Sequence, residues 1–563
     1  RARRRRAAAD RAYRASASRA RRALPRIAAC PPGAPAAPGG PPFSRVGAIP
    51  TASQPMAVAA TPSGRLLYVS AKGVGTGPNP KGPQPDQPTD SDDAIGSTQY
   101  LPLLVKGSAG IGTLPTDAEV AAMTARADGA VRPVNAREAP ADTPLRPDGP
   151  IRHVFFIVRE NRTYDQVLGD DPRGDGDPKL ALFGGDGTPN LHALVRRFPL
   201  LDHVFANSEA SIDGHFWTSA GSVPDYVNKN WWQNYAARGR PYDFPVYAVA
   251  FPANGFLIDQ AARQGISYFN YGEAIAGNIP LPDRDRTPQE SAAVNAKFAN
   301  SDIGIGGPSN CYPNDGSVGK DAITGQTVFD TAPPAGAPPA SRSRFTCFQQ
   351  RFTAQLATGT VPTFNYMVLS NDHTRVLSAG AYTPRAMVAD NDEALGRIVD
   401  LISHSPIWPQ TAIFVVEDDS QDGADHVDAH RIPAAVISPY ARPGAVVHTR
   451  YDFLSVLRSM ELIMGMRPLG LHDANGVPMY DAFQAQPQNL DPYDYVPSRV
   501  DLLETNPSTG PGARASARLP HGLDRAPQRR LDALLWKSVH GWHAAPPPPG
   551  PNASGKDEAD EDG

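Results

Sequence analysis

The chain has 563 residues, a formal net charge of −4 at pH 7 and 40 % hydrophobic residues. This length allows one large α/β domain together with substantial additional material. The near-neutral charge excludes a globally basic nucleic-acid-binding protein, and no uninterrupted apolar run is long enough to span a bilayer.

Residues 1–42 are rich in Arg, Ala and Pro, which predicts a disordered leader. A nucleic-acid-binding arm is the alternative for residues 1–22, where Arg is densest. No signal peptide is visible, and the chain does not begin with Met, as a fragment or a misplaced start would explain. The tail at residues 541–563 is rich in Pro and acidic residues and is also expected to be disordered.

Residues 43–112 consist of short β-type pieces separated by turns, with residues 65–70 as the clearest strand. Residues 113–148 contain a helical pattern at residues 117–126 and then a Pro-rich linker. The main domain is therefore expected at residues 149–540. Because the residues before it offer no hydroxyl or ligand set of a catalytic kind, we expect them to be dispensable for chemistry.

A continuous apolar run at residues 154–158 is typical of a buried strand in a parallel sheet. Polar residues follow at once, beginning with Arg159, Glu160 and Asn161. Ligand sites of open α/β sheets lie just beyond the carboxyl ends of the strands. Glu160 and Asn161 offer hard oxygen ligands suited to a divalent cation, and the alternative is an ordinary solvated turn.

Two further polar segments follow strand-like runs in the same way. Residues 207–217 follow the run at residues 201–205, and residues 371–374 follow the run at residues 364–369. Between them, residues 280–343 are rich in Gly, Pro, Asn and Ser and predict a long insertion or cap. Strand-like runs alternate with helical ones, which predicts a mostly parallel sheet with helices on both faces.

Two helices are predicted after this insertion. Thr383 is a suitable N-cap with Pro384 at the first helical position, and the helix is expected to continue to about Ser403. Residues 451–464 form a second amphipathic helical pattern.

A second acidic turn follows the β-rich run at residues 412–416. It begins with Glu417, Asp418 and Asp419 and leads to another strand-like run at residues 434–437. The other charged residues of this turn are Asp422, Asp425, His426, Asp428, His430 and Arg431. Closely packed like charges repel unless a cation or a proton neutralises them, and Asp mixed with His is metal-ligand chemistry. The turn therefore predicts a metal site, against the alternative of a solvated charged face.

The segments ENRTYDQVLGD and VVEDD…DHVDAHR together resemble the phosphoesterase family that contains bacterial phospholipases C and acid phosphatases. That family is part of the alkaline-phosphatase-like superfamily, and the resemblance covers residues 151–483. It implies an α/β fold with a mostly parallel sheet. A closer resemblance is to bacterial proteins that join an N-terminal β-propeller to such a domain. Residues 61–80 and 97–111 look like their propeller end, which implies a partial propeller-like segment at residues 43–112, since a closed propeller needs about four to eight blades.

The resemblance implies a metal centre built by both acidic turns. Glu160 and Asn161 look like the first half of the ligand set, and Asp418 and Asp419 complete it. Asp372, His426 and His430 are the further candidate ligands, and the two histidines alternatively orient phosphate. The oxygen-rich set leaves Ca, Mg, Mn, Fe or Zn open, with one ion or two.

The resemblance also implies a Ser or Thr nucleophile at the start of a helix, activated by the metal. Ser211 is the choice, and the alternatives are Ser208, Thr218 and Ser219, because the Thr-x-Pro-Asn pattern of many phospholipase C relatives is lacking. A simple helix N-cap is the structural alternative for Ser211. The other candidate catalytic residues are His215, His373, which would bind phosphate or protonate the leaving oxygen, and Arg431, which would clamp phosphoryl oxygens.

The resulting expectation is a metal-dependent hydrolase of phosphate esters, either a phosphatase or a phospholipase C-like enzyme. Its substrate would be a small-molecule phosphate ester or a phospholipid headgroup, with no nucleic-acid partner. A sulfatase is disfavoured because Asp315 stands where the segment beginning at Cys311 would need Arg. The alternative from another class is an inert, propeller-derived binding protein with a structural metal. The resemblance also implies an extracytoplasmic or secreted protein, where Cys311 and Cys347 could pair.

Overall fold

The computed structural model describes residues 45–80, 101–131, 138–231, 248–273, 327–374, 380–420 and 423–507. The chain divides into two compact units, a small one within residues 1–49 and 115–125 and a large one within residues 50–114 and 126–563. The predicted leader, the predicted tail, Cys311 and most of the predicted insertion lie outside the described residues. Among the described residues, no helix combines the length and apolar character that a membrane span needs.

A seven-stranded sheet forms the centre of the large unit, in the order β13-β5-β12-β11-β4-β10-β7. In that order the strands are Val446–Val447, Leu200–Leu201, Ala434–Ile437, Thr411–Glu417, His153–Arg159, Phe364–Leu369 and Tyr268–Tyr271. Every adjacent pair is parallel except the two that involve β12. The mostly parallel α/β sheet predicted from the alternating runs is therefore confirmed.

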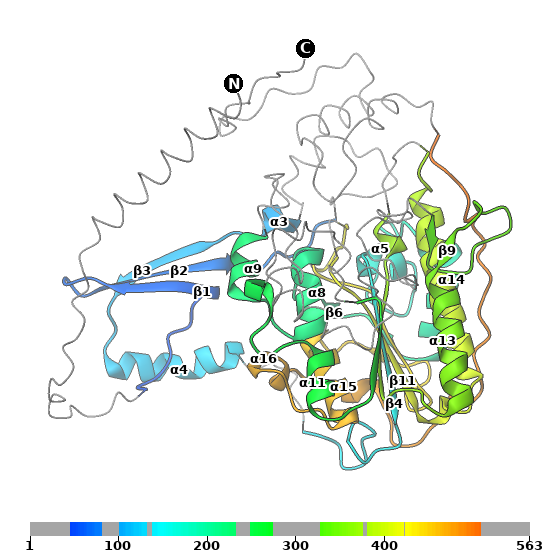
Figure 1. The fold of residues 1–563 in the computed structure, drawn as a ribbon. Helices are drawn as coiled ribbons and strands as arrows, with labels where there is room; N and C mark the ends of the chain where they lie inside the picture. Colours follow the sequence, from blue (N-terminus) through cyan, green and yellow to red (C-terminus); the bar gives the residue numbers. More distant parts are fainter. Residues whose placement is uncertain are drawn as a thin grey trace, which may run out of the picture. The chain divides into compact units, whose positions relative to one another are not determined.

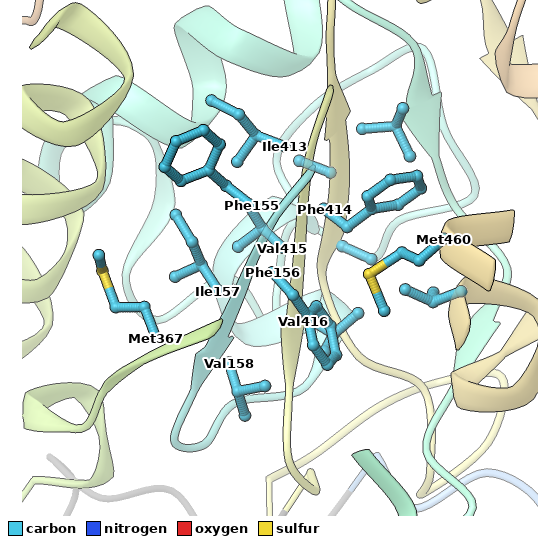
Figure 2. Packing of buried hydrophobic residues seen from close by; sticks show 14 of the residues in the cluster. Phe155, Phe156, Ile157, Val158, Met367, Ile413, Phe414, Val415, Val416 and Met460 are labelled. Atoms are coloured by element: carbon cyan, nitrogen blue, oxygen red, sulfur yellow. The ribbon is translucent and has the colours of Figure 1, made fainter. Parts of the chain in front are cut away.

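The central strands are apolar on both faces because both faces are buried. Phe155 and Ile157 of β4 point to one side of the sheet, and Phe414 of β11 points to the other side toward Met460 (Figure 2). The ring of Phe155 makes edge contacts with the rings of Phe348 and Phe352 in helix α13 (Arg344–Thr358), at centroid distances of 6.3 and 6.0 Å. A strand packed on both sides needs continuous apolar residues rather than alternation, which is why the runs at residues 154–158 and 412–416 mark it.

Helices cover both faces of this sheet, as predicted (Figure 1). Helices α13 (Arg344–Thr358) and α14 (Pro384–Ser403) lie on one side, and α8 (Ser211–Ala220), α11 (Leu257–Arg263) and α15 (Phe453–Met464) lie on the other. The hydroxyl of Thr383 accepts a hydrogen bond from Ala386 N at 3.1 Å, so the predicted N-cap of α14 is confirmed. Other described helices and short strands are α3 (Leu101–Leu104), α4 (Asp117–Val131), α5 (Tyr164–Leu168), α6 (Gly184–Gly187), α7 (Pro189–Arg197), α9 (Asp225–Asn230), α16 (Leu471–Ala474), β8 (Val328–Phe329) and β9 (Arg342–Ser343).

Two elements predicted from the sequence need correction, the strand at residues 201–205 and the helix at residues 451–464. The single strand predicted at residues 201–205 is broken into β5 and β6 (Val204–Phe205), and β6 leaves the large sheet to pair with β14 (Tyr451–Asp452). The break occurs at Asp202, whose buried carboxylate accepts hydrogen bonds from the Asp175 amide at 2.9 Å and from His448 at 2.7 Å. Because residues 451–452 pair as β14, the helix predicted from residue 451 begins at Phe453, with Asp452 as its N-cap.

The N-terminal part of the large unit contains a three-stranded antiparallel sheet. Its strands are β1 (Ser53–Ala60), β2 (Arg65–Gly73) and β3 (Ser108–Thr113), with β2 in the middle. The predicted strand at residues 65–70 is therefore confirmed and forms the first two thirds of β2. Whether this sheet derives from a propeller stays a prediction.

Candidate active site

The candidate site lies at the carboxyl ends of three adjacent parallel strands. Arg159, the last residue of β4, pairs with Glu417 on β11 and with Leu369 on β10. The three strands therefore end at the same level, and the polar turns that follow them meet at one edge of the sheet. Open α/β sheets build their sites at this edge.

Ser211, Asn161 and Asp419 form a hydrogen-bonded triangle at this edge. The Ser211 hydroxyl donates to Asp419 Oδ2 at 2.9 Å, and Asn161 Nδ2 donates to Ser211 Oγ at 3.1 Å and to Asp419 Oδ1 at 2.7 Å. All three side chains are buried. Residues from three distant parts of the sequence thus converge on one hydroxyl.

Ser211 is the first residue of α8 and not its N-cap. The N-cap is Ala210, and the carboxylate of Asp213 accepts the amide N–H groups of Ala210 at 3.0 Å and Glu209 at 3.3 Å. Gly214 lets this helix end approach β11, because a Cβ at Gly214 would collide with the carbonyl oxygen of Asp418. The Ser211 hydroxyl is therefore not used to cap the N-terminus of the helix.

The alternative hydroxyls have other partners. Ser208 donates to the carbonyl oxygen of Asp418 at 2.6 Å, and Thr218 donates to the carbonyl oxygen of Gly214 at 3.0 Å. Ser219 donates to the carbonyl oxygen of His215. Of the four candidates, Ser211 is the one whose hydroxyl meets the predicted ligand side chains.

His215 connects the two acidic turns. Its Nε2 lies 3.6 Å from Glu160 Oε1 and 3.5 Å from Asp418 Oδ2, and its Nδ1 lies 3.0 Å from Glu273 Oε1. Burial lowers the pKa of His215, but the charges of Glu273 and Asp418 raise it well above its ordinary value. Glu273 was missed from the sequence, and its only signal there is its position two residues after the short strand β7.

Several buried acceptors at this edge lack hydrogen bonds. Asn161 Oδ1 and both carboxylate oxygens of Asp418 have no hydrogen-bond donor within the described residues. Burial, followed by the charges of Asp419 and Glu160, raises the pKa of Asp418 well above its ordinary value. Glu160, His215 and Asp418 each offer one ligand atom within 4.8 Å of the others. A divalent cation fits this set, because it would satisfy the acceptors and offset the repulsion between the carboxylates.

Asp372 belongs to a buried ion network beneath the site. Its carboxylate lies 3.2 Å from Arg159 Nη2 and accepts hydrogen bonds from the amide of Glu160 at 3.0 Å and from Asn391 at 2.9 Å. Arg159 also lies 3.4 Å from Glu417. Burial raises the pKa of Asp372 to about 6 despite the opposing charge of Arg159. Asp372 thus holds the backbone at Glu160.

Replacement of Arg159 by Met is expected to destabilise the protein by about 3–5 kcal/mol, because the buried carboxyl groups of Asp372 and Glu417 would lose their cationic partner. Urea unfolding of the variant measures this loss. The matched control is Arg152→Met, since Arg152 is exposed and bonds a single backbone carbonyl. A change below about 1 kcal/mol in Arg159→Met would show that the network carries no net stabilisation.

His373 lies at the end of the turn that follows β10. Its Nδ1 lies 3.2 Å from the carbonyl oxygen of Thr374, and the Arg162 guanidinium donates to the carbonyl oxygen of His373 at 2.7 Å. Burial raises the pKa of Glu160, but His215 and then His373 lower it, so that the net shift is downward. The half-buried His373 imidazole is therefore close enough to Glu160 to act on its charge.

The structure places Arg431, His426 and His430 in other networks. Arg431 is buried, donates to Asp425 and Asp165 at 3.0 and 2.8 Å and to two backbone carbonyls, and stacks on Tyr164. His426 Nδ1 lies 2.6 Å from the Asp165 carboxylate. Asp428 and Glu209 raise the pKa of His430 to about 9, against the effect of burial. Because the Arg431 guanidinium donates its hydrogen bonds to protein acceptors, it is not available to bind phosphoryl oxygens in a bidentate manner.

The fold is of the mostly parallel α/β class, and this edge of its sheet holds a buried serine among carboxylate and amide oxygens. Residues 151–467, more than half of the chain, match the sequence model of the Phosphoesterase family. The chain therefore belongs to this family and is a phosphoric ester hydrolase.

The solved structures to which the chain is similar share little sequence with it. One is a protein of the alkaline phosphatase superfamily from Vibrio parahaemolyticus, with 15 % identity, TM-score 0.36, and coverage of 72 % of this chain and 93 % of that one. Another is the phosphonate monoester hydrolase of Silicibacter pomeroyi, with 12 % identity, TM-score 0.36, and coverage of 60 % of this chain and 77 % of that one. A third is the lipoteichoic acid synthase LtaP of Listeria monocytogenes, with 11 % identity, TM-score 0.35, and coverage of 72 % of this chain and 95 % of that one. No curated protein matches the chain significantly, so the assignment rests on the family match.

Proposed function

We propose that the protein is a divalent-metal-dependent phosphoesterase that uses Ser211 as its nucleophile. The observation that supports this best is the position of the Ser211 hydroxyl, which bonds both Asn161 and Asp419 at the N-terminal end of α8. A cation held by Glu160, Asn161 and Asp418 would supply Lewis-acid polarisation of the phosphoryl group, which leaves Asp419 as the acceptor of the Ser211 proton.

In the first step of the proposed reaction, Ser211 Oγ attacks phosphorus in line with the leaving alcohol. Asp419, which accepts the hydroxyl hydrogen bond at 2.9 Å, takes the proton. The N-terminal end of α8 stabilises the negative phosphoryl oxygens, since the helix dipole favours anions at this end. His373 protonates the departing alcohol. In the second step His373 takes a proton from water as the water oxygen attacks phosphorus, and Asp419 returns its proton to Ser211 Oγ as the bond between serine and phosphorus breaks and phosphate leaves.

His215 holds the two acidic turns together in this proposal. Glu273 orients its ring through Nδ1 at 3.0 Å, which directs Nε2 toward Glu160 and Asp418. A positively charged His215 offsets the excess of carboxylates. Arg431, His426 and His430 are left out of the chemistry because their partners lie in the networks around Asp165, Asp425 and Asp428.

The substrate class that we propose is a small-molecule phosphate ester or a phospholipid headgroup, met outside the cytoplasm. Cys347 is disulfide-bonded, and both other cysteines of the chain lie outside the described residues. Structural disulfides persist in oxidising compartments, which supports an extracytoplasmic location.

A substrate panel with controlled metal content tests this function. The panel contains p-nitrophenyl phosphate, bis(p-nitrophenyl) phosphate, p-nitrophenyl phosphorylcholine and, as the control, p-nitrophenyl sulfate. We expect hydrolysis of at least one phosphate ester, loss of more than about 90 % of it after chelation, and recovery with one of the candidate divalent ions. A folded, metal-binding protein that hydrolyses none of these esters would instead be the inert binding protein.

A further inference from the structure

The segment that follows β2 folds back onto the catalytic part of the large unit. Together with the last two residues of β2 it comprises residues 72–79, KGVGTGPN, and is called the strap below. Gly73, Gly75 and Gly77 have φ angles of 57, 99 and 74°, a left-handed backbone that side chains other than glycine rarely adopt. These three glycines let the chain leave the strand direction of β2 and turn along the second acidic loop.

The far half of the strap is bound to that loop by backbone and side-chain hydrogen bonds. Thr76 Oγ1 and the Gly77 amide donate to the two carboxylate oxygens of Asp428, both at 3.0 Å. The amide of Ala429 donates to the carbonyl oxygen of Gly77 at 2.9 Å. The loop that carries His430 is therefore held by the strap.

Asn79 closes this attachment. Its side chain is fully buried, donates to the carbonyl oxygen of Gly423 at 2.8 Å and accepts from the amide of Asp425 at 2.9 Å. The Asn79 amide also donates to the carbonyl oxygen of Asp425 at 2.8 Å. The Asn79 side chain thus satisfies one buried backbone carbonyl and one buried backbone amide of the loop, so the strap is an integral part of the fold.

The near half of the strap reaches the turn that carries the nucleophile. Lys72 Nζ forms an ion pair with Glu209 Oε1, and the Glu209 side chain is only 3 % exposed. His430 Nε2 lies 3.7 Å from the same oxygen, and Asp213 accepts the Glu209 amide. Glu209 precedes Ser211 by two residues. Its charge is thus faced by two cations, Lys72 and His430, and by one further carboxylate, Asp213.

We propose that Lys72 is a positioning residue for Ser211, acting through Glu209 and the turn at residues 209–211. Loss of Lys72 removes the ion pair that fixes the buried Glu209 carboxylate and leaves His430, at 3.7 Å, as its remaining cationic partner. The Glu209 side chain and its turn then shift, and with them the Ser211 hydroxyl, and misplacement by about 1 Å can cost about 100-fold in rate. This proposal rests on the proposed role of Ser211 and departs from the expectation that all residues before Gly149 are dispensable.

The test uses the full chain with Lys72→Met, Lys72→Arg and the control Lys106→Met, which removes an exposed lysine on the same N-terminal part. We expect Lys72→Met to lower kcat about 10- to 100-fold with KM changed less than about threefold. Lys72→Arg should recover most of kcat, and Lys106→Met should equal the parent. A purely stabilising strap would instead lower the melting temperature in Lys72→Met and leave kcat per folded molecule unchanged, which would overturn the proposal.

A double-mutant cycle shows whether Lys72 acts through Glu209. Glu209→Gln removes the charge that Lys72 neutralises, so adding Lys72→Met to Glu209→Gln should lower kcat by less than about threefold more. Full additivity of the two losses would contradict the coupling.

Amide hydrogen exchange of residues 208–214 gives a readout that needs no substrate. Exchange there should be faster in Lys72→Met than in Lys106→Met and the parent, and slow again in Lys72→Arg. Unchanged exchange overturns the proposal even if the parent hydrolyses no ester, whereas an inactive parent with the expected exchange pattern overturns only the proposed function.

Discussion

Replacement of Ser211 by Ala is expected to lower kcat by at least about three orders of magnitude, since removing the nucleophile of a concerted unit abolishes most of its catalysis. The same change should shift the free energy of unfolding by less than about 1 kcal/mol. The reason is that Ser211 is not the N-cap of α8, and Asp213 already accepts the amide groups at that end. A large kinetic effect with a small stability effect separates chemistry from helix capping.

Ser219→Ala is the matched control for this prediction. It removes a buried hydroxyl from the same helix, but that hydroxyl bonds the carbonyl oxygen of His215 within α8. The control should keep kcat within about threefold of the parent. Intact-mass analysis after rapid acid quenching should detect a phosphoryl group on the parent and on Ser219→Ala, but not on Ser211→Ala. A Ser211→Ala protein that is folded and turns over within about tenfold of the parent would move the nucleophile elsewhere.

The strands that carry the site could be predicted because their burial leaves a local mark. Strands β4, β10 and β11 are covered on both faces and read as continuous apolar runs, and the polar turn after each run marks its carboxyl end. Helix α14 could be predicted for a similar reason, since two adjacent residues mark its start: Thr383 is the N-cap and Pro384 the first helical residue. Patterns of this kind need no knowledge of distant contacts.

The errors arise where long-range polar contacts decide the structure. The break between β5 and β6 depends on hydrogen bonds to Asp202 from residues as distant as His448. Arg431 follows the acidic turn like a phosphate clamp, but its partner Asp165 lies at the other end of the domain sequence. A charged residue in a sequence does not reveal whether its partner is a ligand or another side chain. Glu273 and Lys72 escaped notice for the same reason.

Replacement of Asp418 by Asn is expected to weaken binding of the proposed divalent ion by at least about 100-fold, since even indirect partners of metal ligands are worth about 10- to 100-fold. Titration of the metal-free protein with Mn²⁺ measures the affinity, and kcat at fixed metal should fall in parallel. Asp392→Asn is the control, because the buried Asp392 carboxylate accepts the amides of Asn190 and Leu191 at 2.8 Å, and its loss should affect stability but not metal affinity.

In the metal-free protein, Asp418→Asn is expected to raise the free energy of unfolding, whereas most substitutions of buried residues lower it. The folded-state pKa of Asp418 is raised by burial and by Asp419 and Glu160, so its ionised form destabilises the metal-free fold. At pH 7 the metal-free variant should therefore be more stable than the metal-free parent. This advantage should shrink as the pH falls toward the unfolded pKa of about 3.9, because the folded carboxyl is protonated first. Urea unfolding at pH 7 and pH 5 measures both effects. If the metal-free variant is less stable than the parent at pH 7 and binds Mn²⁺ as tightly, Asp418 is held by protein contacts and does not ligate the ion.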